Sequence, residues 1–271
     1  MIYITGSTGR LGSEAVKRFP NAKKIKRGDS LDFPNATAII HLAGSLNFND
    51  ENDLWESNVE YTRKVVAATP KNARLLYASS IAVYGKILAE IPADEETFCH
   101  PDSTYAKTKH EGEKIALQHP NAVALRIAII YGTDPKFKEF YTFLRRIERG
   151  RIFIIGNGKN RIPFVHVQDV AHAIKNAINA PRGIYVISGE SVEQEKAYQT
   201  AAKLLGVPAP KMHVPLWIAK LFSLAGLIPA DHISMLYHNR MFNCARAKKY
   251  LRFKPRPFQT GLKELVAAYK K

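Results

Sequence analysis

The chain has 271 residues and a formal net charge of +16, from 40 Lys and Arg against 24 Asp and Glu. Its 46% hydrophobic content is enough for a sizeable core, which excludes a disordered chain. The two cysteines, Cys99 and Cys244, exclude a disulfide framework and lack metal-ligand spacing. We therefore predict a reducing, cytoplasmic setting and no bound metal.

The same bulk features limit the partners. No apolar run in the sequence reaches the roughly 18 residues that a membrane span needs, and a strand pattern begins at Ile2, so we expect neither a membrane segment nor a targeting peptide. Basic residues are spread widely, without a compact stripe of stacking aromatics, so we expect no nucleic-acid partner. A small-molecule substrate remains the expected partner.

The first half of the chain alternates short β-branched runs with helical patterns. We expect strands at residues 2–5, 23–27, 38–42, 74–79 and 122–130, and helices at 11–19, 53–68 and 103–118. This alternation predicts an α/β fold with a Rossmann-type, doubly wound parallel sheet. Right-handed crossovers then place the carboxyl ends of all the strands along one edge.

The alternation changes after Gly132. A basic helix at 138–150, a strand at 164–167 and a helix at 169–179 follow, and we expect the last two to return to the main sheet. The proline-rich remainder predicts a smaller, mostly helical lobe. The expected domains are a dinucleotide-binding lobe at 1–180, with 133–163 contributing to the substrate side, and a substrate lobe at 181–271.

Three glycines spaced three apart follow the first strand. Such a strand-to-helix turn leaves backbone N–H groups and the positive end of a helix dipole facing a phosphate. It is also compatible with a glycine-rich turn of any α/β protein. The residues expected to contact a dinucleotide here are Gly6, Thr8, Gly9, Arg10, Leu11 and Gly12.

Two cations end the predicted second strand. NAD-dependent proteins of this fold generally carry an acid there for the ribose diol, whereas Lys26 and Arg27 suit a 2′-phosphate. We therefore predict NADP as the preferred cofactor, with NAD as the alternative. The competing interpretation is that both residues belong to a generally basic surface.

Tyr105 and Lys109 lie four apart on a predicted helix, so their side chains share one face. An ammonium beside a phenol favours the phenolate, which makes the hydroxyl a workable acid or base. Upstream, Ser80 follows a predicted strand and could hydrogen-bond a substrate oxygen. Tyr250 and Lys254 repeat the spacing, but Pro255 ends their helix, and we interpret that copy as accidental.

These motifs occur in one order along roughly residues 1–180. The ordered set is Gly6-x-x-Gly9-x-x-Gly12, His41-Leu42-Ala43-Gly44, Asn58-Val59, Ser80-x-x-Val83-Tyr84-Gly85, Tyr105-x-x-x-Lys109, Leu125-Arg126 and His166-Val167-x-Asp169. As a set it resembles the extended short-chain dehydrogenase/reductase family, the NAD-dependent epimerase/dehydratase group.

The resemblance implies a nicotinamide cofactor and a set of residue roles. The cofactor would also contact Leu42, Ala43 and Gly44. Ser80 would bind the reacting oxygen, Tyr105 would exchange the hydroxyl proton, and Lys109 would tune Tyr105 and hold the ribose. A homodimer through the helices at 53–68 and 103–118 is a further family expectation.

Departures from the family pattern narrow the activity. Ile81 and Ala82 stand where dehydratases of this family place an acid pair, so dehydration is disfavoured. Ile129, Ile162 and Pro163 stand where sugar-nucleotide epimerases carry polar groups for the diphosphate, and Arg161 is one place off. The run 163–167 is closer to the flavonol-type and hydroxysteroid-type ketone reductases.

The leading hypothesis is an oxidoreductase that moves a hydride between NADP(H) and a secondary alcohol or ketone in a rather apolar pocket. A nucleotide-sugar epimerase is the first alternative. A non-catalytic dinucleotide sensor or scaffold is the second, and the presence of Ser80, Tyr105 and Lys109 disfavours it. We expect the apolar run 216–228 to form a buried helix of the small lobe, rather than a cap over an apolar substrate or a membrane contact.

Overall fold

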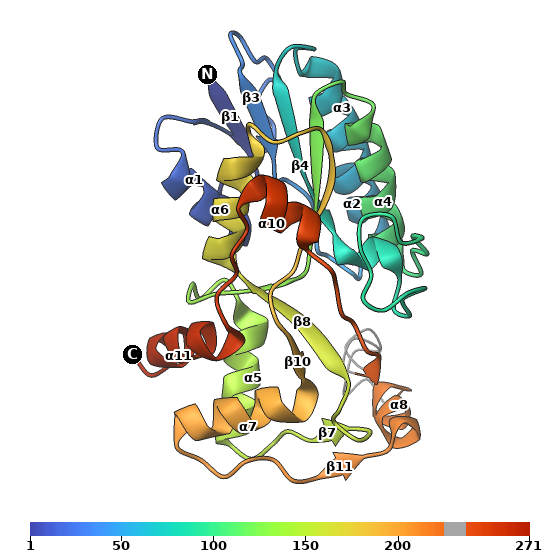
Figure 1. The fold of residues 1–271 in the computed structure, drawn as a ribbon, viewed down its shortest axis with the longest axis vertical. Coiled ribbons are helices and arrows are strands. Elements are labelled where there is room, and N and C mark those ends of the chain that lie inside the picture. The colour runs from blue at the N-terminus through green and yellow to red at the C-terminus, as the bar shows by residue number, and fades with distance from the viewer. Residues whose placement is uncertain (225–236) are drawn as a thin grey trace.

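The computed structural model describes residues 1–224 and 237–271. Its main feature is a six-stranded parallel sheet of order β2-β1-β3-β4-β5-β9 (Figure 1). The strands are β1 Ile2–Thr5, β2 Lys23–Ile25, β3 Ala38–His41, β4 Arg74–Ser80, β5 Ala122–Ile127 and β9 Gly183–Ile187. The predicted Rossmann-type sheet is therefore confirmed.

Helices cover both faces of this sheet (Figure 1). On one side α1 (Arg10–Arg18) packs against α6 (Val167–Ala177), and α10 (Ala245–Leu251) packs against α6 and β9. On the other side lie α2 (Glu51–Trp55), a π-helical turn (Glu56–Glu60), α3 (Tyr61–Ala68) and α4 (Thr104–Leu117). All six residues of β5 are buried, as expected for an apolar strand covered on both faces.

The expected return of strand 164–167 to the main sheet is wrong. The predicted strand 122–130 breaks at Ala128, and its second part, β6 (Ile129–Tyr131), leaves the sheet to pair with β8 (Arg161–His166). A third strand, β10 (Ser191–Glu193), pairs with the other edge of β8. β9, which follows the predicted lobe boundary at residue 180, forms the edge strand of the main sheet next to β5. Helix α6 does pack on the main sheet's side as predicted, against α1.

The second lobe contains strands as well as helices. Its helices are α5 (Lys138–Glu148), α7 (Gln194–Leu205), α8 (Leu216–Leu224) and α11 (Phe258–Tyr269), and β7 (Ile154–Ile155) pairs with β11 (His213–Val214). Buried side chains of α5, α7 and α11, such as Leu144, Ala201 and Leu262, form its core. β8 and β10 also pack here, so a small sheet joins the helices that make up most of the lobe (Figure 1).

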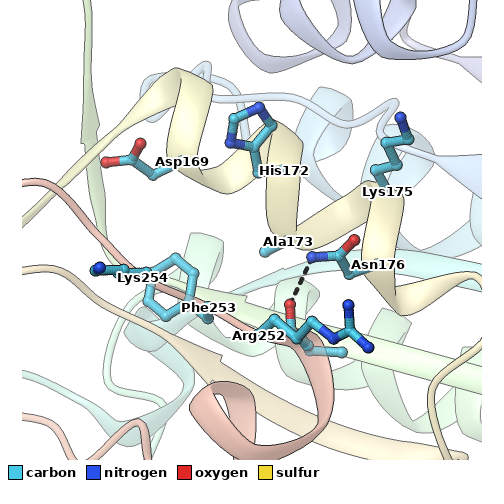
Figure 2. Close-up of a pocket in the computed structure, with 9 residues that line it drawn as sticks. Asp169, His172, Ala173, Lys175, Asn176, Arg252, Phe253 and Lys254 are labelled. Carbon is cyan, nitrogen blue, oxygen red and sulfur yellow. Dashed lines mark hydrogen bonds between the residues drawn. The ribbon is translucent and has the colours of Figure 1, made fainter.

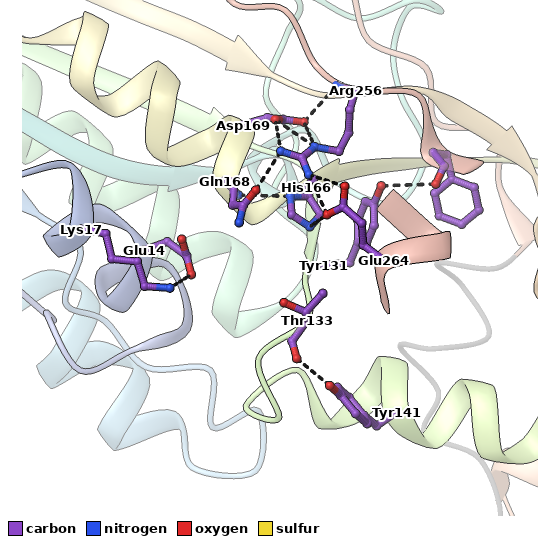
Figure 3. A network of polar contacts seen from close by, with 11 residues as sticks. Glu14, Lys17, Tyr131, Thr133, Tyr141, His166, Gln168, Asp169, Arg256 and Glu264 are labelled. Atoms are coloured by element: carbon purple, nitrogen blue, oxygen red, sulfur yellow. Dashed lines mark hydrogen bonds and ion pairs between the residues drawn. The ribbon is translucent and has the colours of Figure 1, made fainter. Parts of the chain in front are cut away.

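A polar network joins α6 of the sheet to α11 of the second lobe (Figure 3). Arg256 lies 3.0 Å from Asp169 in the first turn of α6 and 2.9 Å from Glu264 of α11. Its backbone N–H also donates to Asp169, and its guanidinium donates to the Gln168 side chain. A single arginine therefore holds two helices that are distant in the sequence.

The expectation that the run 216–228 forms a buried helix is wrong for its described part. Helix α8 covers 216–224, but Trp217, Leu221 and Leu224 are 64%, 52% and 86% exposed. Ala219 is fully buried and faces the small core of β7 and β11. The rest of the run lies outside the described residues. Among the described helices, none combines the length and the apolar character needed to cross a membrane.

Candidate functional site

The glycine turn between β1 and α1 is closely packed against backbone. Gly6 has φ +67°, and a Cβ on it would lie 2.5 Å from the backbone N of Ala43. A Cβ on Gly12 would lie 2.0 Å from the carbonyl oxygen of Gly6. Gly9 is the N-cap of α1 and provides no side-chain cap. The N-terminus of α1 thus has no side-chain cap among the described residues, and Thr8 and Gly9 before it are exposed, which fits an anionic ligand.

The other residues predicted for this turn divide into two groups. Thr8 and Gly9 are exposed, and Arg10 is half-buried with its guanidinium 2.6 Å from the Glu139 carboxylate. Leu11 points into the core, where it is 9% exposed, so only its backbone can face a ligand. The turn therefore offers backbone groups and one cation.

The end of β2 carries the two cations predicted to select NADP. Lys26 is exposed, and its backbone N–H donates to the Asp29 carboxylate. Arg27 is also exposed, and it lies 3.2 Å from Asp53 and donates to the Ser57 hydroxyl. Hence Lys26 keeps a free surface position, while Arg27 is already engaged by the start of the next helix.

The end of β3 meets helix α4 through Asn58. This asparagine lies in the π-helical turn, accepts from the Ser45 N–H at 2.9 Å and donates to the Thr108 hydroxyl at 3.1 Å. A Cβ on Gly44 would lie 2.6 Å from its side-chain oxygen and 3.9 Å from Lys109 Nζ. Gly44, at the end of the predicted cofactor loop 42–44, therefore lies beside Lys109.

Burial governs the charge of the groups at this edge. His41, at the end of β3, is fully buried and bonds Thr5 and Thr62. Burial, with a smaller contribution from Lys109, lowers its pKa to about 3. Lys109 Nζ donates to the Ala78 carbonyl at 2.6 Å and lies 4.4 Å from the Tyr77 ring centroid. Burial lowers the pKa of Lys109 to about 7, so both protonation states are accessible near neutral pH.

Ser80 and Tyr105 lie beside each other. Ser80 ends β4 and accepts from the Ala82 N–H at 3.1 Å, which starts the 3-10 turn Ile81–Tyr84. Tyr105 lies in the first turn of α4, and Phe48 packs edge-on against it at 5.2 Å. Burial raises the pKa of Tyr105, and its side-chain hydrogen bond with Ser80 offsets part of that rise. The accidental copy is different, since Tyr250 is 42% exposed on α10.

A buried ion pair lies behind these residues. Glu113, one turn beyond Lys109 on α4, lies 2.7 Å from Arg126 of β5 and accepts from the Ser79 hydroxyl at 2.5 Å. Arg126 also donates to the Tyr84 hydroxyl at 2.9 Å. Arg126 belongs to the sequence motifs but Glu113 does not, although Glu113 lies four residues after Lys109 and so shares its helix face.

A separate cavity of about 310 Å³ lies between α6 and the segment after α10 (Figure 2). Its floor includes Ala173 and Phe253, its rim carries His172, Lys175 and Lys254, and Asn176 donates to the Leu251 carbonyl at 2.7 Å. Asp169 of the motif set lies in its wall, but its lining includes neither the predicted catalytic residues nor the predicted cofactor-binding residues, so it is not the candidate active site.

Comparisons with known proteins identify the family. The model of the NAD dependent epimerase/dehydratase family matches residues 27–188. Sterol-4-alpha-carboxylate 3-dehydrogenase, decarboxylating, of Dictyostelium discoideum is 24% identical over 75% of this chain and 71% of that protein. The N-acetyl-alpha-D-glucosaminyl-diphospho-ditrans,octacis-undecaprenol 4-epimerase of Escherichia coli O157:H7 is 27% identical over 59% of this chain and 52% of that protein.

A human epimerase family protein solved with NADPH has a TM-score of 0.80 at 18% identity, covering 98% of this chain and 99% of that one. This likeness shows the fold. The present chain spans 52% to 71% of the length of the two relatives named above. The family match covers more than half of the chain and confirms the predicted resemblance. The chain belongs to the NAD dependent epimerase/dehydratase family.

Proposed function

We propose that the protein is an oxidoreductase that transfers a hydride between NADP(H) or NAD(H) and a secondary alcohol or ketone. The observation that carries the proposal is that Ser80 ends β4 beside Tyr105, while Lys109, one turn after Tyr105 on α4, donates to the Ala78 carbonyl of the same strand. The nicotinamide cofactor would supply or accept the hydride. Gly6, Gly9 and Gly12 would hold its pyrophosphate, and Lys109 its ribose.

The protein's own residues would handle the proton. The raised pKa of Tyr105 keeps its hydroxyl protonated at neutral pH, which is the form that can donate to a carbonyl oxygen during reduction. Ser80, hydrogen-bonded to Tyr105, would orient the same oxygen. In its ammonium form, which is accessible near pH 7, Lys109 would stabilise the phenolate that remains.

The substrate class rests on positions of β8 at which the family resemblance leads us to expect polar groups for a diphosphate. Ile162 and Pro163 are buried and present no polar group, and Arg161 is engaged by Glu193 at 3.3 Å. An unpaired diphosphate would cost several kcal/mol to bury, whereas an apolar ligand gains about 25 cal/mol per Å² removed from water. These positions support an alcohol or ketone without a diphosphate.

One observation favours the alternative of a nucleotide-sugar epimerase. Arg240 is 5% exposed and donates to the carbonyls of Ile81 and Gly85, on both sides of the turn that follows Ser80. Its Nε lacks a hydrogen-bond partner in the described chain. A buried arginine beside the turn that follows Ser80 could bind a phosphate. Arg240 was not predicted from the sequence, because no local motif marks it.

Melting curves with NADPH, NADP, NADH and NAD test cofactor binding first. A ligand that binds only the folded protein raises its melting temperature by mass action. We expect a rise with at least one dinucleotide at millimolar concentration. No shift with any of them would contradict the proposal.

The second test separates catalysis from a sensor or scaffold role. Tyr105→Phe removes the transferable proton and little volume, so it should keep cofactor binding and lower turnover about 10²- to 10⁴-fold. Tyr250→Phe, at the accidental copy of the motif, should leave turnover unchanged. The substrates to screen are apolar ketones and alcohols beside uridine, guanosine and thymidine diphosphate sugars. If a sugar nucleotide bound at micromolar concentration and Arg240→Met abolished that binding, the epimerase hypothesis would be favoured over the ketone reductase hypothesis.

A further inference from the structure

The segment that leads into α5 touches the glycine turn. Lys136 Nζ donates to the Thr8 carbonyl at 3.0 Å, and Arg10 lies 2.6 Å from the Glu139 carboxylate. The Arg10 guanidinium also lies 5.8 Å from the Phe137 ring centroid. Phe137 is fully buried, so the segment is fixed at this place rather than resting loosely on the turn.

Two cations and the positive end of a helix dipole lie at this contact, and a carboxylate of the protein occupies the position of a bound anion. Arg10 is the first residue of α1, where the helix dipole is positive, and Lys136 adds a second cation beside the same turn. Glu139 supplies the negative charge that these groups attract. Its pair with Arg10 is partly solvated, because the two side chains are 34% and 53% exposed, and such a pair is weak.

We propose that Lys136 and Arg10 bind the pyrophosphate of the dinucleotide, and that Glu139 is an internal anion that the cofactor displaces from Arg10. This inference rests on the proposed function. A diphosphate offers Lys136 a charged acceptor in place of the neutral Thr8 carbonyl, and it offers Arg10 a bidentate partner. Glu139 therefore competes with the cofactor and sets its affinity.

A purely structural role for Glu139 makes a different prediction. Glu139 lies in the first turn of α5, where a negative charge stabilises the helix dipole. In that case Glu139→Gln would lower the melting temperature and leave cofactor affinity unchanged. Our inference predicts that affinity rises, because the competing carboxylate is lost while the size of the side chain is kept.

Dinucleotide titrations of Glu139→Gln and Glu148→Gln provide the test. Both substitutions remove one negative charge from α5, but Glu148 lies nine residues on, about 13 Å along the helix, where it accepts from the Tyr269 hydroxyl. We expect Glu139→Gln to tighten NADPH and NADH by the same factor, about threefold to tenfold. Glu148→Gln should change neither. Equal effects of the two variants, or a gain confined to NADPH, would overturn the pyrophosphate assignment.

The matching loss-of-contact variant is Lys136→Met, which keeps an unbranched side chain and removes the ammonium. We expect it to weaken both dinucleotides about tenfold, while Lys138→Met, an exposed lysine two residues on, should have little effect. Unchanged affinity in Lys136→Met would overturn the role of Lys136. Failure of the wild-type protein to bind any dinucleotide would instead overturn the proposed function, so the two failures are distinguishable.

Discussion

Lys109 shows how one buried residue can connect the fold to the chemistry. Its ammonium contacts the Ala78 carbonyl and the Tyr77 ring, which replace only part of the hydration it loses. The pKa of Lys109 consequently falls from the ordinary value of 10.5 to about 7. The sequence predicted the pairing of Lys109 with Tyr105, but not this burial, because the Ala78 carbonyl comes from a strand 31 residues earlier.

The lowered pKa predicts how stability changes with pH. Between pH 7 and 10.5 the unfolded chain holds a proton on Lys109 that the folded chain has released, so stability due to this group rises with pH. The slope is at most about 1.4 kcal/mol per pH unit. Urea unfolding of wild type and Lys109→Met at pH 7 and pH 9 measures it. We expect the wild type to gain stability relative to the variant at pH 9, and an unchanged difference would contradict the lowered pKa.

Lys26 and Arg27 predict the cofactor preference. A charge-assisted contact contributes about 1.5 to 3 kcal/mol, so NADPH should bind about tenfold or more tightly than NADH. Because Arg27 is already held by Asp53, Lys26 should contribute the larger share. Titration of both cofactors against Lys26→Ala, Arg27→Ala and the double variant tests this, with Lys71→Ala as a surface control. Equal affinities for NADPH and NADH in the wild type would show that these cations are only part of the basic surface.

At the scale of the element, the turn between β1 and α1 was predictable from its local pattern. The spacing of Gly6, Gly9 and Gly12 predicted a strand, a turn and a helix, and the structure has all three in place. The predicted strands and helices of the sheet also differ from the observed ones mainly at their ends. The hydrophobic periodicity of a segment indicates which of its faces is buried. It predicted these elements because each is buried by its immediate neighbours in the sheet and the helix layers.

Three elements were not predictable in the same way. β8 alternates like a strand, but its pairing with β6 and β10 depends on distant segments. Helix α8 is apolar in sequence yet exposed over much of its surface, because its position in the lobe decides which face is covered. The π-helical turn that places Asn58 beside the Ser45 backbone adds one residue to a helix, which leaves no clear periodic signal.

The glycine turn supports a test that separates folding from binding. A Cβ at position 12 would lie 2.0 Å from a backbone oxygen that cannot move freely, so Gly12→Ala should lower the free energy of unfolding by about 3 kcal/mol or more. Gly9 has φ −71°, and its nearest neighbour to an added Cβ lies at 3.3 Å. Gly9→Ala should therefore fold and lose dinucleotide affinity. Urea unfolding and dinucleotide titration measure the two effects, and a fully stable Gly12→Ala would contradict the packing described.

For the whole molecule, the sequence indicated two lobes but not how the chain divides between them. The chain returns to the main sheet at β9, after the predicted boundary, and again at α10, whose Ala247 and Leu251 pack in the sheet's core. The candidate site likewise combines local motifs with contacts between distant segments. Its local motifs were visible, while the Lys136 contact with Thr8 spans 128 residues and no periodic pattern reports such a distance.

The contact between the lobes gives the last prediction. Removing the guanidinium of Arg256 leaves Asp169, which is 7% exposed, as a buried carboxylate with its main cation lost. Removing one partner of a buried ion pair lowers the free energy of unfolding by about 3 to 5 kcal/mol. Because Arg256 and Glu264 are partly exposed, we expect Arg256→Met to lower it by an amount near the smaller of these values. Urea unfolding of this variant beside Arg182→Met, an exposed arginine, measures the difference.

A second substitution identifies the cause of that loss. Arg256→Met combined with Asp169→Asn removes the unpaired charge as well, so it should recover part of the stability lost in the single variant. If the guanidinium mainly fills space, the double variant would be no more stable than Arg256→Met. If it mainly neutralises Asp169, the recovery should exceed about 1 kcal/mol, because the neutral amide still fits the first turn of α6 at a much smaller desolvation cost.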